Sequence, residues 1–325
     1  MSYEHLTQEQ RYYIFLEYRK QSQSSIARAI GRHRATVKRE LDRNSINGQY
    51  DYRHAQQQYG AKKSSKAAHK MTDKLITTVN HLLIQRLSPE QVCGYLAKHH
   101  QISLHHETIY RHMRKDKAGG GKLYTYMRIL SKPYRKKRGS VWTKGKVPDR
   151  VGIEERPAVV DEKTRIGDWE MDTIVGKDQK SGLLVATERR TKFTVVRKVN
   201  NFKASDMAEA AISSMKKFQE KIFSITLDNG KEFYRHQTFA KKLGAKTYFC
   251  RPYHSWEKGL VENTNGLLRQ YFPKQTDFNL ITDEEIEKVV NELNHRPRKT
   301  LDYDTPSNLF LGVFKPLISA VALYM

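Results

Sequence analysis

A short apolar run that stops at a carboxylate constrains this chain more than any other feature. Residues 225–227 read as a buried strand, and Asp228 follows directly, before an Asn-Gly turn. Glu262 lies further along, near the start of a predicted helix at 260–271. Two acids held beside a strand end suit a divalent metal that acts on phosphate groups. The alternatives are a plain turn at Asp228 and an exposed Glu262 paired to Arg269 on one helical face.

A third acid is expected on a strand at 166–175, where Asp168, Glu170 and Asp172 alternate with apolar residues. Residues at i, i+2 and i+4 of a strand point to the same face. Because unpaired buried carboxylates are costly, at least one of them should meet a cation. The alternation does not say which one, and a solvent-facing acidic face is the other interpretation.

The surrounding pattern predicts a mixed α/β domain. Strands are expected at 166–175, 182–187, 193–199, 222–227 and 246–250, with one helix capped by Ser205 and further helices at 236–243 and 260–271. The short connections between the first three strands favour an antiparallel meander, whereas the fully apolar fourth strand favours a buried, parallel position. Three strands followed by alternating helices and strands is the order of a ribonuclease H-like domain.

Charge divides the chain into unlike halves. The first 150 residues carry 31 Lys and Arg against 11 Asp and Glu, while residues 151–325 carry 28 against 24. A basic half favours a polyanion such as nucleic acid, because each neutralised phosphate releases counterions. A membrane surface is the competing partner, but no basic amphipathic helix with a Trp/Phe/Leu face supports it.

Residues 7–44 are typical of a helix-turn-helix. A capping box starts at Thr7, and Tyr12, Phe15 and Leu16 are expected on the inner face of the first helix. Ser24 or Ser25 is expected to cap a second helix, and Gly31 supplies the turn. The third helix would point basic and polar side chains at DNA, namely Arg34, Thr36, Lys38 and Arg39, with Arg32 ahead of them. A three-helix bundle with a solvated basic face is the alternative.

Residues 72–113 resemble a second helix-turn-helix, with Ser88 and Pro89 as a helix start and Thr108, Arg111 and His112 facing DNA. A purely packing role is the alternative for this part. A basic run follows in a linker, and its residues Arg135, Lys136, Lys137 and Arg138 are expected to track phosphates. A nuclear localisation signal is the formal alternative for that run.

Two cysteines, Cys93 and Cys250, form neither a disulfide framework nor a Cys-x-x-Cys site, which fits a reducing compartment. No signal peptide and no apolar run of membrane-spanning length is expected. We therefore predict a cytoplasmic protein.

Long sequence blocks resemble the transposases of bacterial insertion sequences of the IS-thirty family, which are Asp-Asp-Glu transposases with a retroviral-integrase-like core. The blocks are 31–32, 36–41, 43–44, 88–92, 106–110, 167–176, 228–233, 252–259, 262–274 and 294–299. This resemblance implies a catalytic triad of Asp172, Asp228 and Glu262, the last two separated by the family's interval of 33 residues. It also implies that Arg269 contacts DNA.

The chain departs from the family pattern at two positions. They are His33, where the family usually has a small capping Ser, and Arg251 before a Pro-Tyr pair. Glu257 remains a rival to Glu262.

The resemblance further implies a cofactor, two Mg²⁺ or Mn²⁺ ions held by the triad, and partners. The partners are double-stranded DNA, as terminal inverted repeats and target, and a second copy of the chain in a dimer or larger assembly, on the bacterial nucleoid. The implied function is strand cleavage and strand transfer during DNA transposition. A repressor with an inactive core and a nuclease that cuts without joining are the rival functions.

The expected fold class is multidomain: an all-α helix-turn-helix region followed by an α/β ribonuclease H-like core with a mixed five-stranded sheet. The expected domains are a helix-turn-helix domain at 1–66, a second one at 67–114, a basic linker at 115–160, the catalytic core at 161–315 and a tail at 316–325.

Overall fold

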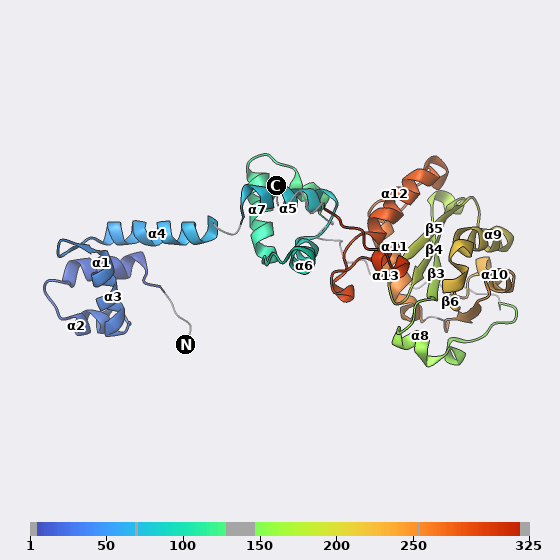
Figure 1. The fold of residues 1–325 in the computed structure, drawn as a ribbon, viewed down its shortest axis with the longest axis horizontal. Coiled ribbons are helices and arrows are strands. Elements are labelled where there is room, and N and C mark those ends of the chain that lie inside the picture. The colour runs from blue at the N-terminus through green and yellow to red at the C-terminus, as the bar shows by residue number, and fades with distance from the viewer. Residues whose placement is uncertain (1–4, 69–70, 128–146, 253, 319–325) are drawn as a thin grey trace. The chain divides into compact units, whose positions relative to one another are not determined.

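The computed structural model describes residues 5–68, 71–127, 147–252 and 254–318, without the side chains of 63–68 and 255. The chain forms two compact units, Met1–Ile76 and Thr77–Met325. Figure 1 shows the helices α1 to α4 at the N-terminal end and a sheet covered by helices in the C-terminal half. The expected order, an all-α region followed by a mixed α/β core, is confirmed.

The first unit is a small helical domain with a two-stranded hairpin. Its elements are α1 (Gln8–Glu17), α2 (Gln23–Ala29), α3 (Arg34–Asn44), β1 (Ser45–Ile46), β2 (Gln49–Tyr50) and α4 (Tyr52–Ala68). Thr7 caps α1 through the predicted capping box. Gly31 turns the chain between α2 and α3 with a positive φ of 64°. His33 caps α3, because its Nδ1 accepts a hydrogen bond from Ala35 N at 3.2 Å. The helix therefore begins at Arg34 with a histidine cap in place of the usual small Ser. The cap of α2 is Ser22, so the prediction of Ser24 or Ser25 is wrong.

The inner face of α1 differs from our prediction. Tyr12, Phe15 and Leu16 are exposed, and the buried residues of the helix are Arg11 and Ile14. Hydrophobic periodicity misassigned this face because it counts an arginine as an outward residue. Here the guanidinium of Arg11 is buried against a carboxylate from α3. Arg11 Nε donates to Glu40 Oε1 at 2.8 Å, and their side chains are 5% and 7% exposed.

Three further helices precede the sheet: α5 (Asp73–Ile84), α6 (Pro89–His100) and α7 (His106–Ala118). Ser88 caps α6 with a complete capping box and Pro89 in the first turn, as predicted. Helix α7 runs past residue 114, the predicted end of this domain, and η1 (Leu123–Tyr126) follows. The first residues of the predicted linker are therefore helical.

Helix α6 packs against the C-terminal segment of the same unit. Gln91 Nε2 donates to Pro297 O at 2.8 Å, and Leu317 N donates to the Tyr95 hydroxyl at 2.8 Å. A side chain at Gly94 would overlap the ring of Tyr303, with atoms 2.2 Å from an added Cβ. The glycine therefore permits the close approach of that ring.

The α/β core is built on a five-stranded sheet of order β5-β4-β3-β6-β7. Its strands are β3 (Asp168–Val175), β4 (Gly182–Glu188), β5 (Thr194–Val199), β6 (Ser224–Leu227) and β7 (Lys246–Phe249). Strands β3, β4 and β5 are antiparallel, while β6 runs parallel to both β3 and β7. The predicted meander and the parallel, fully buried β6 are both confirmed.

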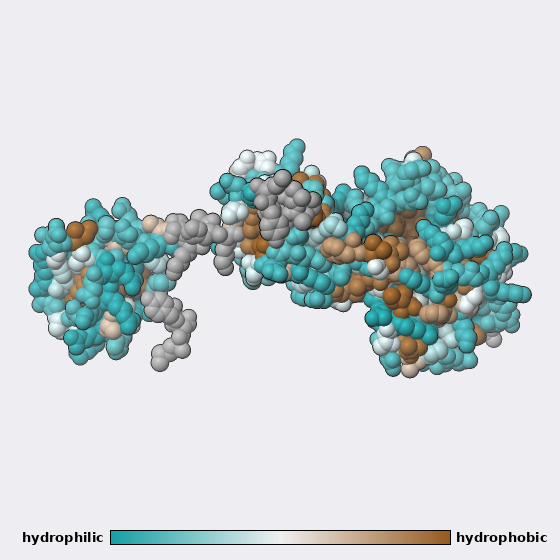
Figure 2. Space-filling view, viewed as in Figure 1, coloured by the Kyte–Doolittle hydropathy of each residue, from teal (hydrophilic) through white to brown (hydrophobic). Residues whose placement is uncertain are grey.

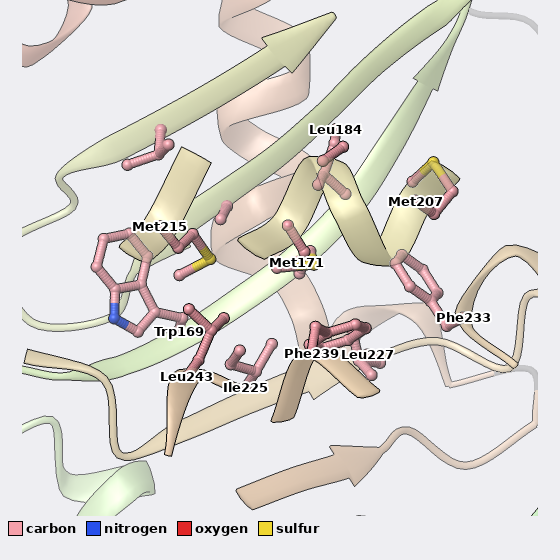
Figure 3. Close-up of a cluster of buried hydrophobic side chains, with 14 of the residues drawn as sticks. Trp169, Met171, Leu184, Met207, Met215, Ile225, Leu227, Phe233, Phe239 and Leu243 are labelled. Atoms are coloured by element: carbon pink, nitrogen blue, oxygen red, sulfur yellow. The ribbon is translucent and has the colours of Figure 1, made fainter. Parts of the chain in front are cut away.

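Helices cover both faces of this sheet. The helices are α8 (Ala158–Glu162), α9 (Ala204–Met215), α10 (His236–Leu243), α11 (Gly259–Leu268), α12 (Asp283–Asn294) and α13 (Pro306–Leu311). One core joins Trp169 and Met171 of β3 to α9 and α10 (Figure 3). The other joins Ile174 to α11 and α12. Helix α9 starts at Ala204 with Lys203 as its cap, so the predicted cap at Ser205 is wrong.

The surface is mainly hydrophilic on the face seen in Figure 2, although hydrophobic side chains are also visible on the C-terminal unit. The exposed large hydrophobic residues of this unit include Trp256 at 68% and Leu309 at 38%. In the part of the chain that the structure describes, no helix is long and apolar enough to cross a bilayer.

The buried pair in the first unit yields a stability prediction. We expect Glu40→Ala to destabilise this unit by about 3–5 kcal/mol, because Arg11 would keep its buried charge without a carboxylate. Hydrogen–deuterium exchange of the full chain would show faster exchange in α1 and α3 and no change in the sheet. The matched control is Asp42→Ala, an exposed acid on the same helix. Equal exchange in the two variants would contradict the prediction.

Candidate active site

The three acids of β3 point toward the face that α11 covers, and each meets a different cation. Asp168 is 1% exposed and accepts two hydrogen bonds from Arg165, from Nε at 2.8 Å and from Nη2 at 2.9 Å. Ser224 Oγ of β6 donates to the same carboxylate at 2.6 Å. The oxygens of Asp168 are thus occupied in holding β3 to its neighbours.

Glu170 is also buried, at 2% exposed, and ties β3 to the start of α11. Its Oε1 accepts from Arg189 Nη1 at 2.6 Å, and its Oε2 accepts from Leu260 N at 3.1 Å and Val261 N at 3.0 Å. Burial raises the pKa of this carboxyl, and the Arg189 guanidinium and the Val261 N–H oppose that rise. A carboxylate at a helix N-terminus is favourable both for the free N–H groups and for the helix dipole.

Asp172 is the most accessible of the three, and it lies near Asp228. Lys258 Nζ stands between the two carboxylates, 3.1 Å from Asp172 Oδ1 and 3.9 Å from Asp228 Oδ2. The lysine side chain is 5% exposed, against 20% for Asp172 and 34% for Asp228. Burial alone would lower the pKa of Lys258, but the two carboxylates outweigh burial and raise it. The site therefore already contains a buried positive charge between two acids from neighbouring strands.

Two further side chains, from α11 and its C-terminal end, contact the strand that carries Asp172. Asn265 Nδ2 donates to Asp172 Oδ2 at 2.8 Å. Arg269 Nη2 donates to Val175 O at 2.6 Å, where β3 ends. Glu262 shares one face of α11 with Asn265 and Arg269, because residues at i, i+3 and i+7 share a face of a helix, and Lys258 directly precedes the helix. Its side chain is exposed, and Arg269 bonds to main-chain carbonyls, so the alternative of a Glu262–Arg269 pair is not seen.

Glu257, the rival of Glu262, is engaged in the loop before α11. Its Oε2 accepts a hydrogen bond from Arg251 N at 2.8 Å. It lies in η6 (Ser255–Lys258), one residue before the lysine that contacts the acids. Glu257 is therefore bound to the backbone of Arg251, whereas the Glu262 side chain is exposed.

A further acid beside Asp228 was not among our sequence candidates. Glu232 in η5 (Lys231–Phe233) accepts from Thr173 Oγ1 at 3.4 Å, and burial raises its pKa, with Asp228 and Asp172 adding to the rise. A Cβ at Gly230 would lie 2.4 Å from Glu232 Oε2, so the glycine makes room for this carboxylate. The block 228–233, already noted for its resemblance, was the signal that could have identified it.

Two family models match the chain: an integrase core domain over residues 163–255 and a helix-turn-helix domain over residues 2–44. A transposase for insertion sequence element IS4351 of Bacteroides fragilis is 42% identical over 310 residues, covering 94% of this chain and 95% of the relative. The transposase InsI for insertion sequence element IS30C of Escherichia coli K12 is 29% identical over 307 residues, covering 89% of this chain and 79% of that one. This chain belongs to the insertion-sequence transposases of the IS-thirty family.

The transposase presents most of its predicted recognition residues at the surface of the first unit. Arg34, Lys38 and Arg39 are exposed on α3, while Arg32 and Thr36 are half-buried. Val37 is fully buried on the opposite side of the helix. The basic face of α3 is therefore free of packing in this unit, as a helix that enters a groove of DNA requires.

The residues that we predicted to face DNA from a second helix-turn-helix are less uniformly exposed. Arg111 is exposed, 4.0 Å from the Glu107 carboxylate, and Thr108 is half-buried. His112 instead faces α5, with its Nε2 2.7 Å from Asn80 Oδ1, so its position differs from the DNA-facing one that we predicted. The basic run Arg135, Lys136, Lys137 and Arg138 lies outside the described residues.

The buried pair Glu170–Arg189 yields a second stability prediction. We expect Arg189→Met to lower the thermal midpoint of the transposase, because loss of one partner from a buried pair costs about 3–5 kcal/mol. The adjacent Arg190→Met is the matched control, since Arg190 is exposed. Thermal unfolding followed by circular dichroism would measure both variants, and equal midpoints would refute a structural role for the pair.

Proposed function

We propose that Asp172, Asp228 and Glu262 form the catalytic centre of this transposase, which cleaves DNA at the ends of its element and joins them to target DNA. The observation that carries the proposal is the contact of Lys258, directly before α11, and of Asn265 on α11 with the Asp172–Asp228 pair, because Glu262 shares a helical face with Asn265. Family membership supplies the class of reaction, a polynucleotidyl transfer.

The residues present fit a divalent cation. Asp172 and Asp228 already have a cation between them, and their oxygens are the hard ligands that Mg²⁺ and Mn²⁺ prefer. Among the described residues, no group of three or more His, Cys, Asp or Glu is close enough to hold a metal. We therefore propose that the exposed Glu262 side chain moves toward Asp172 and Asp228 when the site assembles on DNA.

When bound, two Mg²⁺ or Mn²⁺ ions would lower the pKa of the attacking water or hydroxyl group and offset the negative charge that develops on the leaving oxygen. The three carboxylates would hold them. Asn265 fixes the orientation of Asp172, and the backbone N–H of Gly230 fixes that of Asp228, because it donates to Asp228 Oδ1 at 3.1 Å. Arg165 and Arg189 occupy the other two acids of β3, which keeps Asp168 and Glu170 from competing for the ions.

The helix-turn-helix domains would bind the terminal inverted repeats, with Arg34, Lys38 and Arg39 on base edges and phosphates. Two ends of the element must be brought together before both are joined to target DNA. We therefore propose that the working form contains at least two copies of the chain.

The carboxylate assignment predicts how matched variants differ in strand transfer. We expect Asp228→Asn and Glu262→Gln each to lose roughly 100-fold or more, in line with the loss of a group that stabilises transition-state charge. Glu257→Gln should retain activity, because Glu257 only binds the Arg251 amide. Labelled DNA from an end of the element, incubated with target DNA, gives the readout.

Undiminished joining by Glu262→Gln would remove that residue from the triad. Hydrolysed ends without joined products, from the unaltered protein, would instead support a nuclease that cuts without strand transfer. Because the Glu262 side chain is exposed, we expect Glu262→Gln to keep the thermal midpoint of the unaltered protein, and that measurement shows whether the variant is folded.

The buried lysine predicts a response to metal that does not depend on activity. We expect Lys258→Met to lower the thermal midpoint in EDTA, because Asp172 and Asp228 would repel each other without a cation between them. Mn²⁺ should then raise the midpoint of Lys258→Met more than that of the unaltered protein. Lys274→Met, at an exposed position, is the control. Equal Mn²⁺ responses in the three proteins would count against a metal site at these acids.

A further inference from the structure

A cavity lies beside the N-terminal half of α11. It has a volume of about 840 Å³ and is lined by residues from three parts of the core, around 163–170, 189–192 and 256–263, and by the segment near Leu301 and Leu309. Gly259, Leu260 and Asn263 form its wall from α11. Neither Asp172, Asp228 nor Glu262 lines it, so it is separate from the carboxylate site.

Positive charge is concentrated in this cavity. Lys163, Arg190 and Lys192 all line it, although residues 151–325 as a whole carry 28 Lys and Arg against 24 Asp and Glu. Its two carboxylates are already engaged: Glu170 with Arg189 and the start of α11, and Glu257 with the Arg251 amide. The cavity therefore has an excess of cations over available acids.

The effect of this excess of positive charge is seen at Lys192. Its ammonium donates to Thr300 Oγ1, and no ion pair of Lys163, Arg190 or Lys192 is found within the described residues. Burial lowers the pKa of Lys192, and the positive charges of Arg298 and Lys163 lower it further. A half-buried lysine next to like charges is unfavourable in the free protein, and an anion in the cavity would relieve it.

The shape and the remaining walls narrow the choice of anion. A cavity of about 840 Å³ is of the size that takes small-molecule ligands, which corresponds to a few nucleotide units rather than a duplex. Trp256, 68% exposed, and Leu260 and Leu309 add a flat aromatic surface and apolar contacts. Aromatic side chains beside cations are the combination that binds unpaired nucleotides by stacking and by phosphate contacts.

We propose that this cavity binds a short unpaired stretch of the DNA strand, with its phosphates on Lys163, Arg190 and Lys192 and a base stacked on Trp256. The proposal rests on the DNA-transposing function above and adds a site for single-stranded DNA to it. Because Trp256 and Lys258 are two residues apart, a strand leaving the carboxylate site around the start of α11 reaches the cavity within a short distance.

The experiment measures binding of three DNA substrates to the full chain in EDTA, so that no reaction occurs. All contain the same duplex from an end of the element. The first is blunt, the second carries three unpaired thymidines at that end, and the third carries three abasic units instead. The ratio of the dissociation constants for the blunt and tailed substrates isolates the contribution of the tail from that of the helix-turn-helix domains.

Two sets of variants separate phosphate binding from stacking. In Lys163→Gln/Arg190→Gln/Lys192→Gln, we expect the benefit of the abasic tail to disappear and that of the thymidine tail to fall to the part contributed by stacking on Trp256. The slope of log K against log salt for the tailed DNA should also fall by about 0.7 for each phosphate that the variant no longer neutralises. In Trp256→Ala, only the thymidine tail should lose affinity, by about 5- to 150-fold per stacked base. The control Lys216→Gln/Lys241→Gln/Lys242→Gln removes three exposed cations from outside the cavity and should keep the tail benefit.

The proposal is overturned if the unaltered protein binds blunt and tailed DNA equally, or if the cavity variant and the control variant lose the same affinity. An unchanged tail benefit in Trp256→Ala would overturn the stacking of a base on that ring. These outcomes are distinct from a failure of the proposed function, which would appear as absent strand transfer while the tail benefit in EDTA persists.

Discussion

Carboxylates placed beneath a helix require cations, and this requirement organises the core of the transposase. Asp168 has Arg165, Glu170 has Arg189, and Asp172 has Lys258. The first two acids are almost fully buried and bound on both oxygens, so they hold strands and helix together. Asp172 is more accessible, and its cation is an ammonium on a flexible stem rather than a guanidinium fork. Only this third position combines negative charge with the freedom to exchange its partner.

Much of the fold was predictable because its signals are local. The capping boxes at Thr7 and Ser88 and the turn at Gly31 depend on a few neighbouring residues. The apolar run at 222–227 indicated a parallel strand because such strands are buried on both faces. Burial of Arg11 against Glu40 was not predictable in this way, because the partner lies 29 residues away and reverses the apparent inner face of α1.

The candidate site was only partly predictable for the same reason. Alternation places the three acids of β3 on one face and treats them alike, so the residues alone could not select Asp172. What distinguishes it is contact with Lys258 and Asn265, which lie 86 and 93 residues further along the chain. Family resemblance alone supplied the choice of Asp172 as a catalytic acid, and these contacts are the reason that we propose it. Glu232 was overlooked because nothing in its local pattern shows that η5 turns its carboxylate toward Asp228.

The start of α11 lies between the proposed carboxylate site and the proposed cavity site. Glu170 accepts the N–H groups of Leu260 and Val261, which anchors the first turn of the helix to β3. From that turn, Glu262 lies on the face that follows Asp172, while Leu260 and Asn263 line the cationic cavity on another flank. One buried acid thereby sets the position of both flanks. If DNA passes from the carboxylates to the cavity, the geometry of its path depends on Glu170, although neither it nor Arg189 needs to take part in the chemistry.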